Sequence, residues 1–240
     1  MKFTDSHLHM QDYKTNNAQQ IIEDLKSIGF VSAVCISSTS ESWKNVSKIA
    51  RDHSEFIIPA FGLHPWYIKQ APLNWENILR DYLKEFPNAQ VGECGLDCLK
   101  AEIDGQQEVF EKQIIIANEF NRPLNVHLLK AEDWFIKLLP SISSRFMLHS
   151  FNGSSNFLHA VLDAGGFISL SSVILKRKNG LSIMKEIPVS RLLIESDGPY
   201  LSDYKDIPTL ITSIANAKNI DPKELCSTVY SNFKEFNYGK

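Results

Sequence analysis

The stretch Phe3-Thr4-Asp5-Ser6-His7-Leu8-His9 lies near the start of a 240-residue chain and decides its fold. Side chains alternate across a β-strand, so His7 and His9 point to one face, about 6–7 Å apart along it. Two imidazoles presented by one strand supply half of a metal site. An isolated His-x-His pair also arises by chance, so the remaining ligands must come from other strands.

Short apolar runs follow this stretch and alternate with longer amphipathic segments. With it they predict eight strands, at residues 2–9, 31–37, 56–62, 89–93, 124–128, 145–150, 166–170 and 191–195. Helical patterns lie between them, at residues 18–28, 41–53, 75–86, 106–121, 132–139, 156–164 and 181–186. Residues 207–217 and 222–236 are predicted to form two closing helices. Eight strands, each followed by a helix, predict an α/β fold, a single (β/α)8 barrel of TIM type over residues 1–240.

Glycine and proline positions agree with this layout. Gly29 ends the first helix, Gly165 and Gly166 close the sixth, and Pro123 opens the fifth strand, where its missing N–H is harmless. An open, doubly wound sheet would need a glycine-rich phosphate turn after the first strand, and residues 5–9 contain no glycine. No repeat or linker divides the chain, which favours one domain over two small ones.

The charge balance excludes some kinds of nucleic-acid binding. The chain has 25 basic and 28 acidic residues, a formal net charge of −3, and no run of like charges. Tight binding of long duplex DNA needs many cationic contacts to phosphates. Phosphate recognition is therefore expected to be local, at a small cluster or a metal.

The expected cellular location follows from three absences in the sequence. The chain has no apolar run of about 18 residues, as a membrane-spanning helix needs, and no signal-peptide core at its start. Its four cysteines form no Cys-x-x-Cys pair and are expected to stay reduced: Cys35, Cys94, Cys98 and Cys226. We expect a cytoplasmic protein without a membrane partner or an obligate protein partner.

Candidate metal ligands lie where barrel active sites are built, at the carboxyl ends of the predicted strands. Five of the seven histidines fall there, with two carboxylates: His7, His9, His64, His127, His149, Glu93 and Asp197. Imidazole and carboxylate ligands suit Zn, Mn, Fe or Co, and Mg is less favoured. The pattern predicts two divalent cations that share a carboxylate.

Strand order suggests how the ligands are divided. His7 and His9 are expected to hold one ion with Asp197, because strand eight neighbours strand one in a closed barrel. His127 and His149, from neighbouring strands, are expected to hold the other ion. Glu93, on strand four, is placed to bridge the two.

Such a pair of cations suits hydrolysis. Two ions about 3.5–4 Å apart clamp a phosphoryl oxygen, lower the pKa of a bound water and stabilise the leaving oxygen. Glu93 and Asp197 are the predicted catalytic residues, and Asp197 is expected to take the proton of the attacking water.

Further polar residues at the strand ends are expected to support this centre. His64 has no obvious ion, and we expect it to contact substrate phosphate. Asp5 and Glu195 are predicted to be buried, where a carboxylate is costly unless paired, so each is expected to orient a ligand histidine. Asp97 is expected either to do the same or to fix its own turn.

Aromatic side chains border the predicted mouth of the barrel: Trp66, Tyr67, Phe151 and Tyr200. Stacking on nucleotide bases is one use for such residues. Ordinary packing beside the site is the alternative.

In these motifs the chain resembles the TatD-type metal-dependent hydrolases, a branch of the amidohydrolase-like barrels. The matching stretches are Asp5-Ser6-His7-Leu8-His9, Gly62-Leu63-His64-Pro65, Gly92-Glu93-Cys94-Gly95-Leu96-Asp97, His149-Ser150-Phe151-Asn152-Gly153 and Leu193-Ile194-Glu195-Ser196-Asp197-Gly198-Pro199-Tyr200-Leu201. They follow the family's order from the first predicted strand to the last. The resemblance implies a TIM-type barrel, a two-metal centre and phosphodiester hydrolysis, with DNA as the usual substrate.

The chain departs from the family pattern at two places. The family's fifth-strand motif usually has Arg two residues after its histidine, whereas His127 is followed by two leucines and then Lys130. After Leu201 the family usually carries a basic loop, and this chain has the short, acidic stretch 202–208 instead. Both changes remove cationic contacts to a phosphate backbone. Lys130 is the predicted replacement, and a solvated lysine at a helix start is the alternative.

We therefore predict a two-metal phosphodiester hydrolase, a deoxyribonuclease that acts on DNA ends or short single strands. One alternative is a phosphoesterase for small phosphorylated metabolites. Another is an amidohydrolase that cleaves a C–N or lactone bond, which often bridges its metals with a carboxylated lysine where this chain has Glu93. The third is a metal-binding scaffold without catalytic activity.

Overall fold

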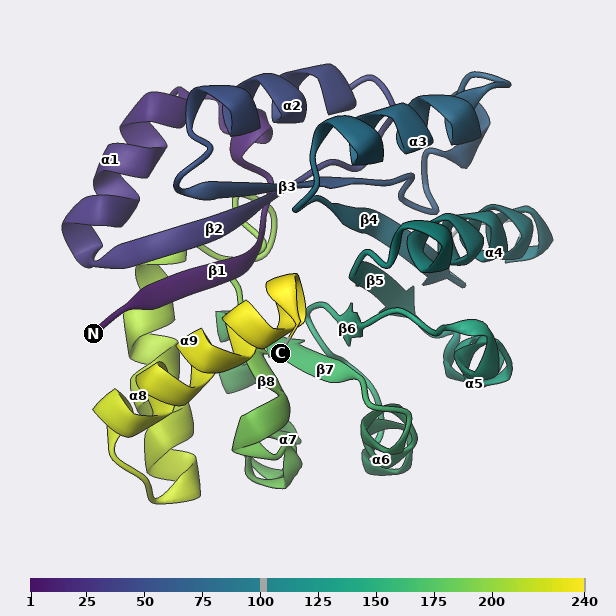
Figure 1. The fold of residues 1–240 in the computed structure, drawn as a ribbon. Helices are drawn as coiled ribbons and strands as arrows, with labels where there is room; N and C mark the ends of the chain where they lie inside the picture. The colour runs from purple at the N-terminus through teal and green to yellow at the C-terminus, as the bar shows by residue number, and fades with distance from the viewer. Residues whose placement is uncertain (100–102, 240) are drawn as a thin grey trace.

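The computed structural model describes residues 1–99 and 103–239 of the chain. Eight parallel strands lie side by side in chain order and curl into a nearly closed barrel (Figure 1). They are β1 (Phe3–Leu8), β2 (Phe30–Ile36), β3 (Ile57–Phe61), β4 (Gln90–Asp97), β5 (Leu124–Leu129), β6 (Phe146–Leu148), β7 (Phe167–Leu170) and β8 (Leu192–Ile194). The predicted (β/α)8 barrel is confirmed.

Helices surround this barrel on its outer side, and one further helix, the last of the chain, lies across an end (Figure 1). They are α1 (Ala18–Ile28), α2 (Trp43–Asp52), α3 (Trp75–Glu85), α4 (Ile103–Phe120), α5 (Glu132–Leu138), α6 (Ser155–Asp163), α7 (Gly180–Glu186), α8 (Ile207–Lys218) and α9 (Pro222–Tyr238). Short 3-10 turns include η1 (Met10–Asp12), η4 (Ser172–Lys176) and η6 (Tyr204–Asp206). Each predicted helix is present, and the predicted bounds differ by a few residues.

Helix α1 shows how local sequence sets these elements. Asn17 and Gln20 form a capping box, in which each side chain accepts a hydrogen bond from the other's backbone N–H. The helix buries Ile21, Ile22 and Leu25 against the sheet. Gly29 ends it with a φ of 106°, a left-handed conformation that glycine adopts at little cost. The side-chain cap of Asn17 at the start of the helix contributes about 1 kcal/mol to stability.

Helix α9 covers one end of the barrel. Its Phe233 and Phe236 belong to an apolar cluster inside the barrel, together with strand residues such as Val34, Ile58 and Leu193. Gln90, the first residue of β4, donates from its amide to Asn237 Oδ1 at 2.8 Å. Because strands begin at this end, α9 closes the amino-terminal end, and α9 crosses the front of the barrel in Figure 1. The carboxyl ends of the strands are left for the site.

The barrel closes where β8 meets β1. The backbone N–H of Asp197 donates to the carbonyl of His7 at 2.9 Å, and the N–H of His9 donates to the carbonyl of Gly198 at 2.8 Å. Three predicted metal ligands therefore lie on one seam, as the strand order predicts.

Strand β4 runs four residues further than predicted, to Asp97. The predicted strand ended at Glu93, before Gly95, and a glycine in the interior of a strand usually weakens it. Here Gly95 has a φ of 139° and lies against β5, where a Cβ would collide with the carbonyl oxygen of His127. The glycine lets the two backbones approach, so the strand continues and carries Asp97 to the site.

Candidate metal centre

All seven predicted ligand and contact residues gather at the carboxyl end of the barrel. Side chains from six strands or strand ends converge there: His7, His9, His64, Glu93, His127, His149 and Asp197. Six of them are buried, and His127 is partly exposed. Segments up to 190 residues apart in sequence thus form one cluster of imidazoles and carboxylates.

His7, His9 and Asp197 form what we call the first half-site. The Nε2 atoms of the two histidines lie 3.1 Å apart. Asp197 Oδ1 lies 3.7 Å from His7 Nε2 and 3.5 Å from His9 Nε2. These three atoms are close enough to one another to hold a single ion.

His64, His127 and His149 form the second half-site, around the other side of Glu93. His127 Nδ1 and His149 Nε2 lie 3.1 Å apart. Their distances to Glu93 Oε1 are 3.2 and 3.0 Å. His64 Nε2 lies 3.5 Å from the same oxygen, so this histidine, expected to lack an ion, belongs to a group that could hold one.

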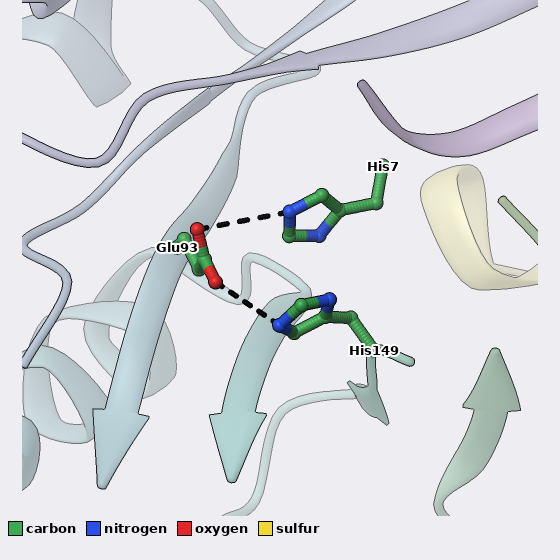
Figure 2. A group of neighbouring side chains, drawn as sticks. All are labelled: His7, Glu93 and His149. Atoms are coloured by element: carbon green, nitrogen blue, oxygen red, sulfur yellow. Dashed lines mark ion pairs between the residues drawn. The ribbon is translucent and has the colours of Figure 1, made fainter. Parts of the chain in front are cut away.

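Glu93 lies between the two half-sites. Its Oε2 atom is 3.7 Å from His7 Nε2 and 3.4 Å from His9 Nε2, whereas its Oε1 atom faces the second half-site. Figure 2 shows the carboxylate between His7 and His149, with one oxygen directed to each ring. This is the placement expected of a bridging carboxylate.

The donor set fits divalent cations in spacing. Two ligand atoms about 2.0–2.1 Å from one tetrahedral ion lie about 3.3 Å apart. The nitrogen–nitrogen and nitrogen–oxygen separations within each half-site are close to that value. The mix of imidazole and carboxylate suits Zn, Mn, Fe or Co.

Hydrogen bonds behind the rings also fit metal binding at His7. His7 Nδ1 lies 2.9 Å from Asn125 Oδ1, and the Asn125 amide nitrogen donates to Ser6 O and Gln90 Oε1. The amide is therefore oriented with its oxygen toward His7, which places the imidazole proton on Nδ1. The lone pair of His7 Nε2 is left directed into the centre, as a metal ligand requires.

Polar groups also lie behind the other candidate ligand histidines. Asp97 Oδ2 lies 3.2 Å from His127 Nε2, and Glu195 Oε1 lies 3.4 Å from His149 Nδ1. Both acids thus lie where an orienting carboxylate is expected. His9 Nδ1 is 3.4 Å from Ser38 Oγ.

Two supporting residues differ from expectation. Asp5 was expected to orient a ligand ring, but its carboxylate accepts from the backbone N–H of His7 and from the N–H and hydroxyl of Ser196. It therefore fixes the seam between β1 and β8. Asn125 was missed, although it shares the inward face of β5 with His127, two residues away, and that alternation was the available signal.

The electrostatics of the cluster favour positive charge at its centre. Burial alone would lower the pKa of His9, but its hydrogen bond to Asp197 and the charge of Glu93 raise it to about 10. Burial alone would likewise raise the pKa of Glu93, but His64 and His149 hold it well below its usual value. Burial lowers the pKa of His64 to about 3, so this ring is a neutral donor. A centre whose two carboxylates stay ionised and stabilise a protonated His9 also favours a divalent cation, which would take the place of that proton.

A cavity of about 320 Å³ opens above the half-sites. Aromatic and apolar side chains line part of it, among them Trp66, Tyr67, Tyr200 and Leu201. The loops after β6 and β7 add polar groups from Ser150, Asn152 and Arg177. The cavity thus combines apolar walls with a polar side, above buried metal-ligand groups.

Trp66 and Tyr200 are fixed at the mouth by acids near the centre. Trp66 Nε1 donates to Asp97 Oδ2 at 2.6 Å, and the Tyr200 hydroxyl donates to Asp12 Oδ2 at 3.0 Å. The two side chains remain 46% and 63% exposed, so much of each ring is accessible.

Two predicted substrate contacts lie elsewhere. The expectation that the Phe151 ring borders the mouth is wrong, because the residue is only 3% exposed and the ring stacks on Phe157 at a centroid distance of 6.1 Å. Lys130 is exposed and lines a separate, smaller hollow between the loops after β5 and β6. The cation at the main cavity is Arg177, which sequence reasoning missed because Lys176, Arg177 and Lys178 look like a solvated face.

Known proteins resemble this chain over nearly its full length. A family model described as TatD related DNase matches residues 4–237. An uncharacterized metal-dependent hydrolase of Buchnera aphidicola is 30% identical over 221 residues, which cover 84% of this chain and 83% of the relative. The 3'-5' ssDNA/RNA exonuclease TatD of Pantoea ananatis is 25% identical over 205 residues, covering 81% and 78%.

The fold also matches a solved structure. The crystal structure of YJJV, a TatD homolog from Escherichia coli, superposes with a TM-score of 0.89, covering 99% of this chain and 98% of that one. The two are 18% identical, so this likeness concerns the barrel fold alone. Within the described residues, every helix is too short or too polar to cross a bilayer.

Proposed function

The chain belongs to the TatD-related DNase family, and from this membership we propose that it hydrolyses phosphodiester bonds of nucleic acid with two divalent cations. Its broader class is metal-dependent hydrolase. The observation that carries the two-cation proposal is the placement of Glu93, whose two oxygens face separate groups of imidazoles. A single-ion site would leave one of these groups without a purpose.

The roles of the residues follow from their positions. His7, His9 and Asp197 would hold one cation, His127 and His149 the other, and Glu93 both. His64, a neutral ring beside the second half-site, would contact substrate phosphate. Divalent cations, when bound, polarise a phosphoryl oxygen and lower the pKa of water. The nitrogen-rich donor set favours Zn, Mn, Fe or Co over Mg.

Asp197 is the proposed proton acceptor. Its Oδ1 atom faces the first half-site, Oδ2 lies 3.9 Å from His149 Nδ1, and the residue lines the cavity. A carboxylate in reach of both half-sites can take a proton from an attacking water and hold it near the leaving oxygen. Burial alone would raise the pKa of the Asp197 carboxyl, but its hydrogen bond to His9 lowers it, so the carboxyl stays ionised.

The proposed substrates are ends of DNA and short single strands. Bases that are unpaired can stack on aromatic side chains, and Trp66 and Tyr200 hold exposed rings at the mouth. A cavity of about 320 Å³ is of the size that a terminal nucleotide or another small ligand occupies. The relative from Pantoea ananatis is named for single-stranded DNA and RNA. A cytoplasmic location is part of the proposal, supported by four free cysteines.

The test is hydrolysis by metal-loaded protein. Single-stranded oligonucleotides labelled at either end, a blunt duplex, bis(p-nitrophenyl) phosphate and an amide or lactone panel are assayed with Zn, Mn and Co. We expect stepwise shortening of single strands and cleavage of the small phosphodiester. Cleavage of amides or lactones without phosphodiesterase activity would overturn the proposal. His159→Ala, which removes an exposed histidine of α6 outside the centre, is the control for nonspecific metal effects.

A further inference from the structure

The segment after Leu201 folds away from the cavity. Tyr204 is 2% exposed, and its hydroxyl donates to Asp24 Oδ2 on α1 at 3.1 Å. Lys205 Nζ lies 3.1 Å from the same carboxylate. The main cavity is lined by Tyr200 and Leu201 but by no described residue of this following turn. The turn therefore offers no cation to a substrate.

A cation reaches the cavity from the neighbouring loop. Arg177 directly follows η4, which begins two residues after β7, and among the described residues that line the main cavity it is the one Lys or Arg. Its Nη1 donates to the carbonyl of Phe151 at 2.7 Å, which holds the guanidinium against the loop after β6. Lys176 and Lys178 on either side are exposed.

The guanidinium of Arg177 has no acidic partner among the described residues. In the part of the chain that the structure describes, no carboxylate oxygen lies within 4.0 Å of Arg177, and its only hydrogen bond is the one to Phe151. Burial lowers its pKa somewhat, yet an arginine stays protonated in proteins. A half-buried positive charge is costly unless an anion pairs with it. The missing anion would come with the substrate.

Strand order places Arg177 relative to the aromatic wall. In an eight-stranded barrel β3 and β7 lie on opposite sides. Trp66 follows β3 and Arg177 follows β7, so the two border the mouth from opposite sides, with the metal-ligand groups between and below. A nucleotide chain crossing the mouth would meet a stacking surface on one side of the scissile bond and a cation on the other.

We propose that Arg177 binds the phosphate next to the scissile one in a single-stranded substrate, a role that rests on the proposed nuclease function. Guanidinium pairs with phosphate oxygens through two parallel N–H donors, and Arg177 retains donors beyond the one used on Phe151. The β7–α7 loop thus supplies the backbone contact that the acidic turn after β8 does not.

The competing explanation is purely structural. Arg177 would then only brace the loop 149–153 through the Phe151 carbonyl, and its loss would disturb His149 and the second half-site. If Arg177 has that role alone, its loss should lower kcat on every substrate and should also lower the metal content of the protein. If Arg177 contacts phosphate, its loss should raise KM on oligonucleotides alone and should weaken the dependence of kcat/KM on salt.

Three variants separate these roles. Arg177→Gln removes the charge but keeps an N–H for Phe151, Arg177→Lys keeps the charge, and Lys185→Gln removes an exposed cation of α7 as a matched control. Metal-loaded protein is assayed on a short single-stranded oligonucleotide and on bis(p-nitrophenyl) phosphate over a range of NaCl concentrations. Metal content is measured in parallel.

For Arg177→Gln we expect the oligonucleotide KM to rise about tenfold, as for loss of one charge-assisted hydrogen-bonded pair. The slope of log(kcat/KM) against log[salt] should fall in magnitude by about 0.7, the value for one phosphate contact on a single strand. Activity on bis(p-nitrophenyl) phosphate and metal content should not change. Arg177→Lys should restore most of the slope, and Lys185→Gln should match the wild type.

An unchanged slope and KM in Arg177→Gln would overturn the inference, as would an equal loss on both substrates with reduced metal. If the wild type hydrolyses neither substrate, the proposed function fails. Fluorescence anisotropy with a labelled single-stranded oligonucleotide then still decides on Arg177, because the salt slope of binding does not depend on cleavage.

Discussion

The two half-sites share Glu93 but are built differently. The first half-site lies on the seam between β1 and β8, and the side chains of His7 and His9 are 0% and 3% exposed. The second half-site draws one histidine from each of three strand ends, and the His127 side chain is 16% exposed. Barrel closure thus forms the first half-site, whereas loops and neighbouring strands form the second.

The outer partners, which are the groups behind each imidazole on the side away from the centre, also differ between the two half-sites. His7 is held by the neutral amide of Asn125 inside the barrel, among buried polar groups. His127 is held by Asp97, which also holds Trp66 at the mouth. The second half-site is therefore linked to the substrate cavity. We infer that the first half-site holds its cation more tightly and that the second responds to substrate.

The largest effect should come from the residue common to both half-sites. Glu93→Ala removes the carboxylate that faces all five histidines of the two half-sites, so both cations would lose a ligand. Activity should fall on the order of 10³-fold, as when a main source of transition-state charge stabilisation is lost. Steady-state kinetics on the metal-loaded variant, with His159→Ala as control, measure this. Near-normal turnover would show that Glu93 does not bridge.

Asp197→Asn should act mainly on the first half-site. The substitution keeps the shape of the side chain but removes its charge and its basicity. We expect a rate loss on the order of 100-fold together with weaker binding of the tighter ion. Competition with a chromogenic chelator measures both affinities. The comparison between half-sites breaks down if the weaker ion is lost instead.

A matched pair of outer-partner variants should sharpen the comparison further. Asn125→Leu removes the acceptor for His7, and Asp97→Asn removes the charge behind His127. Outer partners contribute about 10–100-fold in metal affinity or activity. Chelator competition should show Asn125→Leu weakening the tighter ion and Asp97→Asn the weaker one. An identical effect of both variants on both ions would contradict the division.

The smallest effect is expected at the rim of the cavity. Tyr200→Ala removes a ring that lies at a T-shaped contact of 5.0 Å to His9, whereas Tyr200→Phe keeps the ring and loses only the bond to Asp12. Loss of one stacked base should raise the oligonucleotide KM about fivefold in Tyr200→Ala. Tyr200→Phe should stay within about twofold. Equal KM values for the wild type and Tyr200→Ala would remove stacking from the proposal.

The helices and strands were predictable because local residues mark where most of them begin and end. Apolar runs, Gly29 after the first helix and Pro123 before the fifth strand indicate where elements begin and end. Strand β4 is the exception, because the approach of Gly95 to the backbone of His127 depends on the partner strand. Local sequence does not encode such a contact.

The convergence of the site was predictable for a related reason. The candidate ligand side chains lie at strand ends, and the order of parallel strands in a barrel determines which ends meet. Phe151 and Arg177 were not predicted correctly, since their positions depend on packing between loops. Asn125 was overlooked, although strand alternation places it on the same face as His127. Phe151 packs on Phe157 instead of facing the mouth, and Arg177 lies at the cavity with its guanidinium hydrogen-bonded to the loop after β6.

The central claim is that one chain holds two cations, one in each half-site, with Glu93 between them. Metal-free protein reconstituted with Zn or Mn, desalted and analysed by inductively coupled plasma mass spectrometry measures this directly. We predict two ions per chain in the wild type, one in His127→Ala, and a loss of phosphodiesterase activity in that variant. A wild type that binds one ion at saturation, or a His127→Ala variant that keeps two, would contradict it.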